Sequence, residues 1–108
     1  MGPLPGERVL IADADPGLRR QIHKRLEDSN VSADCVADGR SAMQRLRESS
    51  YGVILLDIAL PHLGAERVLE FMRQMPASER PVILVVAEPS AARSLDVDLV
   101  QIVLRKPC

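Results

Sequence analysis

Three residues that could carry chemistry stand at equivalent places in the sequence, each at the end of an apolar run. Asp13 ends the run over 8–13, Asp57 ends the run over 52–57, and Lys106 follows a third run close to the end of the chain. Carboxylates are ligands that hard divalent cations prefer, and a lysine ammonium pairs with phosphate as a point charge. These residue types suit a metal or phosphate site, provided that the fold brings them together.

The order of the predicted elements supplies such a fold. Apolar runs indicate strands, and apolar residues at helical spacing lie between them. We expect strands over 8–13, 31–36, 52–57, 82–87 and 99–104, and helices over 16–28, from 39 onward, over 64–75 and, as a short piece, over 90–95. This βαβαβαβαβ order predicts an α/β fold with a doubly wound, five-stranded parallel sheet. Sites in such sheets lie beyond the carboxyl ends of the strands, where Asp13, Asp57 and Lys106 fall.

The composition indicates one domain with an aliphatic core. Of 108 residues, 46% are hydrophobic and 27% charged, and the net charge is -1. There is no bulk positive field for direct binding of nucleic acid or of an acidic membrane surface. The apolar runs have strand length and no secretory signal precedes them, so we expect a cytoplasmic protein without a membrane span. Residues 1–7, rich in Pro and Gly, predict a flexible arm ahead of a single domain over 8–108.

At these spacings the motifs resemble those of a response-regulator receiver domain, the phosphoacceptor module of two-component signalling. The similar stretches are 51–61, with its apolar run, Asp57, three residues and a proline, then 9–16, with its run, acids and proline, and finally Lys106-Pro107. The resemblance covers about Arg8 to Pro107. It implies a flavodoxin-like receiver fold and a signalling module that is not a substrate-turning enzyme.

The resemblance also implies roles for individual residues. Asp57 would accept a phosphoryl group from a histidine kinase or a phosphotransfer protein, and Lys106 would contact the phosphoryl oxygens. Asp13, Asp57 and the backbone carbonyl of Ala59 would hold Mg²⁺. A carboxylate that attacks phosphorus needs such a cation to offset the charge of the incoming oxygens. The implied downstream partner is an output domain or partner protein, with a homodimer as one form of assembly.

The sequence departs from the receiver pattern in four places. Ala14 replaces the second acid of the metal-binding pair, so we expect weakened Mg²⁺ binding. Asp15 is more simply interpreted as a helix N-cap, and it would replace the missing acid only if the loop rearranged. Val86 replaces a Thr or Ser and Val103 an aromatic switch residue, so atypical switching is expected. The sequence given stops at Cys108, so we expect the fifth helix to be missing and its place to be covered by a longer protein or another chain.

Two other functions remain open from the sequence alone. The missing acid, hydroxyl and ring also suit a pseudo-receiver that acts as a phosphorylation-independent interaction module. Less favoured is a haloacid-dehalogenase-like phosphatase fragment, because Asp13-Ala14-Asp15 resembles the first motif of that family but no acidic pair follows a later strand. The basic residues of the predicted helices, at 19–20, 24–25 and 45/47, are expected to be solvated.

Overall fold

A computed structural model describes residues 8–62, 64–87 and 102–105 of the chain. Strands and helices alternate along it, as the apolar pattern predicts. The elements are β1 (Val9–Ala12), α1 (Pro16–Asp28), β2 (Ala33–Val36), α2 (Gly39–Glu48), β3 (Val53–Asp57), α3 (Gly64–Arg73), the 3-10 helix η2 (Ala77–Glu79), β4 (Val82–Ala87) and β5 (Ile102–Arg105).

The five strands form one parallel sheet in the order β2-β1-β3-β4-β5. The chain first moves outward from β1 to β2 and then returns past β1 to β3. The change of direction between β1 and β3 is the place where doubly wound sheets bind ligands. The predicted doubly wound, five-stranded parallel sheet is therefore confirmed.

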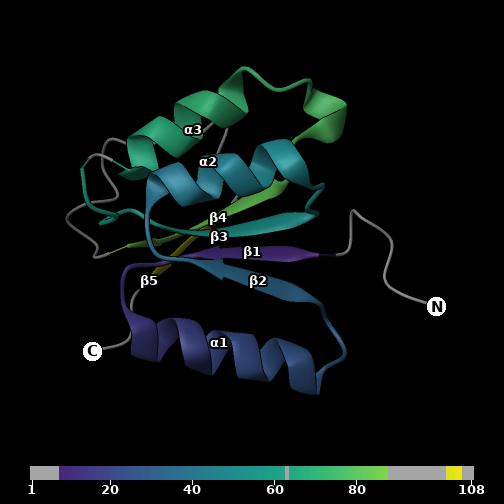
Figure 1. Cartoon of the computed structure of the whole chain (residues 1–108), viewed down its shortest axis with the longest axis vertical. Coiled ribbons are helices and arrows are strands. Elements are labelled where there is room, and N and C mark those ends of the chain that lie inside the picture. The colour runs from purple at the N-terminus through teal and green to yellow at the C-terminus, as the bar shows by residue number, and fades with distance from the viewer. Residues whose placement is uncertain (1–7, 63, 88–101, 106–108) are drawn as a thin grey trace.

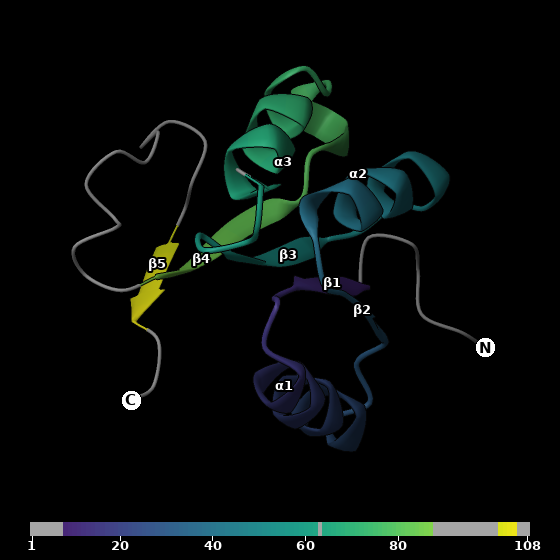
Figure 2. The same ribbon diagram turned by 60° about the vertical axis from the view of Figure 1, so that its left-hand side comes forward.

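The described helices cover the two faces of this sheet unequally. Figures 1 and 2 show α1 on one face and α2 beside α3 on the other. No described helix combines the length and apolar character needed to cross a membrane. The predicted short helix over 90–95 lies outside the described residues.

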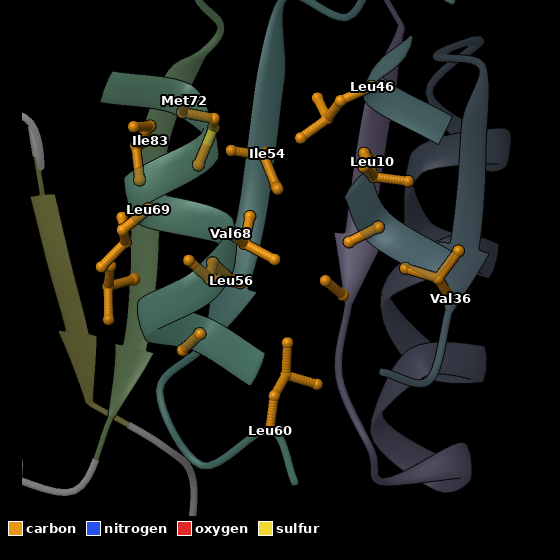
Figure 3. Packing of buried hydrophobic residues seen from close by; sticks show 14 of the residues in the cluster. Leu10, Val36, Leu46, Ile54, Leu56, Leu60, Val68, Leu69, Met72 and Ile83 are labelled. Atoms are coloured by element: carbon orange, nitrogen blue, oxygen red, sulfur yellow. The ribbon is translucent and has the colours of Figure 1, made fainter. Parts of the chain in front are cut away.

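The main core lies between the sheet and helices α2 and α3. Alternate strand residues point to this side, since successive side chains of a strand face opposite ways. In Figure 3, Val68, Leu69 and Met72 of α3 lie over Ile54 of β3 and Ile83 of β4. The other buried members are Leu10, Ala12, Val36, Ala42, Leu46, Tyr51, Leu56, Leu60, Ala65 and Val85.

The α1 face of the sheet is less completely covered within the described residues. Leu18, Ile22 and Leu26 form the predicted stripe of α1, yet each is only half-buried. Ile11 beneath them is fully buried, whereas Val82 at the start of β4 is 44% exposed. Among the described residues, burial on this face is therefore complete at Ile11 of β1 and incomplete at the start of β4.

Two element boundaries differ from the predictions, for local reasons. The strand predicted over 31–36 begins only at Ala33, because the amide of Val31 donates to the Leu26 carbonyl (2.8 Å) and Asn30 adopts a left-handed conformation (φ 62°). These features belong to the C-terminal cap of α1. The helix predicted over 64–75 ends at Arg73, since the proline at 76 disfavours helical backbone in the residue before it. The last strand occupies 102–105, and 99–101 lie outside the described residues.

A polar cluster joins the first three strands on the side away from their carboxyl ends. The Tyr51 hydroxyl donates to Oδ2 of Asp34 at 2.6 Å, and the Arg8 guanidinium donates to the same oxygen at 2.8 Å. Burial, followed by the hydrogen bond to Asp34, raises the pKa of Tyr51 to about 12. The cluster therefore holds the phenol neutral and ties the edge strand β2 to the segment before β3.

Titration of Tyr51 tests this cluster, because the chain has no other tyrosine. The folded-state pKa exceeds the ordinary value of 10.0, so the cluster's contribution to stability is full below pH 10 and is lost as the pH rises toward 12. We expect the tyrosinate absorbance of the folded protein to rise with a midpoint near 12, and that of the denatured protein near 10. Asp34→Asn should lower the folded midpoint only in part, since burial is the larger cause. A folded midpoint at the ordinary value, with circular dichroism unchanged, would contradict the cluster.

Candidate functional site

Two buried carboxylates lie side by side at the carboxyl ends of β1 and β3. Asp57 is the last residue of β3, and Asp13 directly follows β1. Ala12 is in register with Leu56, so Asp13 and Asp57 occupy the next step on neighbouring strands. Each residue is only 2% exposed. Burying ionisable groups is costly unless they are paired or bind a cation, so this pair marks a polar site in an otherwise apolar region.

Backbone amides orient both carboxylates in the same way. The amide of Asp15 donates to Oδ1 of Asp13 at 2.8 Å, and the amide of Ala59 donates to Oδ1 of Asp57 at 2.9 Å. Each is a turn in which an aspartate accepts from the residue two positions on. The loops after β1 and β3 are therefore held in conformations that present the two carboxyl groups at the same edge of the sheet.

Arg19 fixes the loop after β1 and was missed by the sequence analysis. Its guanidinium donates to the carbonyl oxygen of Asp13 at 2.7 Å, and the residue is half-buried, so the prediction of a solvated side chain was wrong. No signal in the sequence distinguishes Arg19 from the exposed Arg20 beside it, because the contact depends on how α1 leaves β1.

Asp15 does not join the two buried carboxylates. It is exposed, and its Oδ1 accepts from the amides of Gly17 (2.9 Å) and Leu18 (3.3 Å) at the start of α1. It is therefore the N-cap that the Asp15-Pro16 pair predicts. Ala14 beside it is exposed and contributes no carboxylate. Within the described part of the chain, no three acidic, histidine or cysteine side chains converge as a metal site would require.

The other predicted site residues differ in how close they lie to Asp57. Ala59 is exposed in the turn after β3, two residues from the acceptor position, with its amide bonded to Asp57. Val86 of β4 is in register with Asp57 and is 7% exposed. The valine side chain therefore takes the position that a Thr or Ser hydroxyl has in the receiver pattern. Val103 pairs with Val85 between β4 and β5. Lys106 lies outside the described residues.

A family model described as the response regulator receiver domain matches residues 9–108. The chain belongs to this receiver family. Receiver domains are signalling modules of two-component systems and are generally not enzymes. The predicted resemblance is thereby confirmed, and the phosphatase alternative loses its support, since Asp15, its supposed acid–base residue, caps a helix.

The curated relatives of this receiver domain are larger signalling proteins. Response regulator ArlR of Staphylococcus saprophyticus is 28% identical over 81 residues, which cover 75% of this chain and 36% of ArlR. Signal transduction histidine-protein kinase BarA of Escherichia coli is 29% identical over 86 residues, which cover 79% of this chain and 9% of BarA. The chain thus spans about a third of the first relative and under a tenth of the second.

Solved receiver structures share the fold of this receiver domain. A CheY-like receiver domain from Methylobacillus flagellatus superposes with a TM-score of 0.80 at 20% identity, covering 95% of this chain and 88% of that one. Response regulator TrrA from Thermotoga maritima, solved in complex with Mg²⁺ and BeF, has a TM-score of 0.75 at 21% identity and covers 94% of this chain and 87% of TrrA. These likenesses confirm the CheY-like, flavodoxin-like fold.

Proposed function

We propose that this receiver domain accepts a phosphoryl group on Asp57 from a histidine kinase or a phosphotransfer protein, with weakened Mg²⁺ binding and atypical switching. The observation that supports this best is the position of Asp57. Its carboxylate is buried at the carboxyl end of β3, beside Asp13, at the change of direction in the sheet. An output domain or partner protein would respond to the change. The unit over 8–108 would act as one domain, in the cytoplasm, with a homodimer as one form of assembly.

The chemistry assigned to Asp57 is nucleophilic. A carboxylate oxygen of Asp57 would attack phosphorus, the bond from phosphorus to the donor histidine would break, and the imidazole would take up a proton. The amide of Ala59 already holds Oδ1 of Asp57, so the carboxyl group needs little reorientation for this attack. Lys106 would pair with the phosphoryl oxygens.

The residues present can hold a magnesium ion, but they supply few protein ligands for it. Receiver domains bind Mg²⁺ at the phosphorylation site, where the ion offsets the charge of the phosphoryl oxygens. Asp13 and Asp57 would hold it through their carboxylates and Ala59 through its carbonyl oxygen, a hard oxygen set of the kind that Mg²⁺ accepts together with waters. Ala14 supplies no further acid and Asp15 is occupied at α1, so we infer weaker binding than a receiver with an acid at 14 would show.

Intact mass spectrometry after incubation with acetyl phosphate tests the proposal. We expect the protein to gain one phosphoryl group in the presence of Mg²⁺ and none when the metal is chelated. The Mg²⁺ concentration should be varied up to values that saturate a weak site, because the affinity of the domain for Mg²⁺ is expected to be low. No gain at any Mg²⁺ concentration would count against phosphoacceptance.

Ala14→Asp is expected to raise the affinity for Mg²⁺ roughly tenfold, equivalent to about 1.4 kcal/mol. An added carboxylate increases the charge and ligand count available to a hard cation. A matched control is Ala37→Asp, which adds the same charge to an exposed residue after β2, at the same edge of the sheet. Titration calorimetry should show tighter binding for the first variant alone. Equal affinity in wild type and Ala14→Asp would mean that another group already fills the role.

One observation favours the alternative, a phosphorylation-independent pseudo-receiver. Val86 places two methyl groups in register with Asp57, so no hydroxyl at this position can bond a phosphoryl oxygen. On this view the domain binds its partner in one conformation only. Partner binding that is unchanged by acetyl phosphate and by Asp57→Asn would support it.

A further inference from the structure

A groove of about 800 Å³ runs between α2 and α3, on the face opposite α1. Its lining includes Arg40, Met43 and Arg47 of α2, His62 of the loop before α3, and Arg67 of α3. Neither Asp13 nor Asp57 belongs to it. We call it the α2–α3 groove, and the proposed phosphoryl transfer gives it no role.

The lining residues of α2 lie along one side of that helix. Arg40, Met43 and Arg47 are spaced i, i+3 and i+7, which places them in a single stripe. At a rise of about 1.5 Å per residue, the two arginines stand roughly 10 Å apart along the helix axis. Arg67 of α3 faces them from the other wall. The groove therefore has two arginines on the wall formed by α2 and one arginine on the wall formed by α3.

The described lining of the groove holds more cations than acids. Among the described residues, none of the three arginines forms an ion pair with a carboxylate, whereas Arg8 pairs with Asp34 and Arg73 with Glu70 elsewhere. The one acid in the lining is Asp38, whose carboxylate accepts from the Ser41 amide at 2.8 Å as the N-cap of α2. Within the described lining, three guanidinium groups stand against one carboxylate. That carboxylate caps α2, and its pKa is lowered by the hydrogen bond from Ser41 and, to a smaller extent, by the charge of Arg40.

Part of the lining is apolar. Ala37, Met43 and Pro61 belong to it, and Met43 is partly buried against the core. The guanidinium of Arg47 lies over the ring of Phe71, which is outside the lining, at 5.1 Å from the ring centroid. This contact holds Arg47 at the edge of the groove while leaving its charge available. Guanidinium groups with no ion pair among the described residues, beside the apolar surface of Ala37, Met43 and Pro61, match a ligand that has carboxylates and an apolar side chain.

We propose that the α2–α3 groove binds an acidic amphipathic helix of a partner protein. Acidic side chains at i and i+7 of that helix would match the spacing of Arg47 and Arg40, and an apolar residue between them would contact Met43. Arginine suits this role because its planar fork can bond a carboxylate with two donors. The inference goes beyond the proposed function, because it needs neither Mg²⁺ nor phosphorylation of Asp57.

A synthetic peptide serves as the probe. It is an alanine-rich helix of roughly 15 residues, near the lower limit for helix formation in water, with two glutamates seven positions apart and a leucine between them. A second peptide carries glutamine in place of glutamate. Fluorescence anisotropy gives the dissociation constant, and amide shifts in heteronuclear NMR spectra of the receiver domain locate the contact. We expect shifts confined to α2, α3 and the loop before α3, and at least severalfold weaker binding of the glutamine peptide.

Paired variants separate the groove from the overall charge of the protein. Arg40→Gln with Arg47→Gln should weaken binding about tenfold, whereas the exposed control pair Lys24→Gln with Arg45→Gln, which removes the same charge, should change it less than twofold. Asp57→Asn should bind like wild type, so failure of phosphoryl transfer would not affect this result. Equal losses in the two pairs, shifts outside the groove, or stronger binding of a single-stranded oligonucleotide to the same residues would each overturn the proposal.

Discussion

Asp57→Asn is expected to abolish phosphoryl uptake, whereas the wild-type receiver domain gains one phosphoryl group from acetyl phosphate and Mg²⁺. The asparagine side chain has nearly the same shape, but its amide lacks the negative charge of the nucleophile and is a poor ligand for Mg²⁺. Its carbonyl oxygen can still accept from the Ala59 amide, so the turn after β3 should persist. Intact mass spectrometry measures the uptake, and circular dichroism verifies the fold.

Asp38→Asn is the matched control for this variant. Asp38 lies at the same edge of the sheet, two residues after β2, and it caps α2 through the Ser41 amide. Asparagine is as good an N-cap as aspartate, so the control should remain folded and accept one phosphoryl group. Uptake that persists in Asp57→Asn, or that disappears in Asp38→Asn, would refute the assignment of Asp57.

Gly39→Ala is expected to destabilise the protein by about 1–3 kcal/mol, because of the close approach of α2 to α3. A Cβ atom at Gly39 would lie 2.7 Å from both the Cα and the carbonyl oxygen of Gly64, distances that the backbone of α3 must relieve by moving. Helix propensity alone would favour alanine by up to about 1 kcal/mol, so the sign of the change isolates the contact. Urea denaturation measures it.

Gly17→Ala makes the same chemical change where there is room for it. A Cβ atom there would meet only Oδ1 of Asp15 at 3.4 Å, an ordinary contact in the first turn of α1. We expect this variant to be unchanged or stabilised by up to about 1 kcal/mol. Gly39→Ala with wild-type stability would show that α2 and α3 can separate at no cost, contrary to the packing of their first turns.

The positions of Asp13 and Asp57 could be predicted because they depend on a simple pattern. Both end runs of residues that are apolar on both faces of a strand, and such runs belong in the middle of a parallel sheet. Parallel strands bring their carboxyl ends to one edge, so acids at the ends of β1 and β3 are expected at the same edge, and the observed pairing of these two strands makes the acids neighbours. The alternation of strands and helices predicts that all the strands run parallel, which places both acids at the same edge of the sheet.

Contacts made by tertiary packing could not be predicted in the same way. The bond from Arg19 to the Asp13 carbonyl depends on how α1 leaves β1, and the Gly39–Gly64 contact depends on how two distant helices meet. The late start of β2 depends on the amide of Val31, which the C-terminal cap of α1 takes from the strand. Each of these features depends on a contact between segments whose relative position the sequence pattern does not predict.

The most direct test of the central claim is to locate the modified residue. After incubation with acetyl phosphate and Mg²⁺, borohydride reduces an aspartyl phosphate to homoserine, and tandem mass spectrometry of the digested protein then identifies its position. We predict homoserine at position 57 alone, and its absence when the metal is chelated. Homoserine at Asp13, Asp15 or Asp38 instead, or at no position under saturating Mg²⁺, would contradict the assignment of Asp57 as the phosphoacceptor.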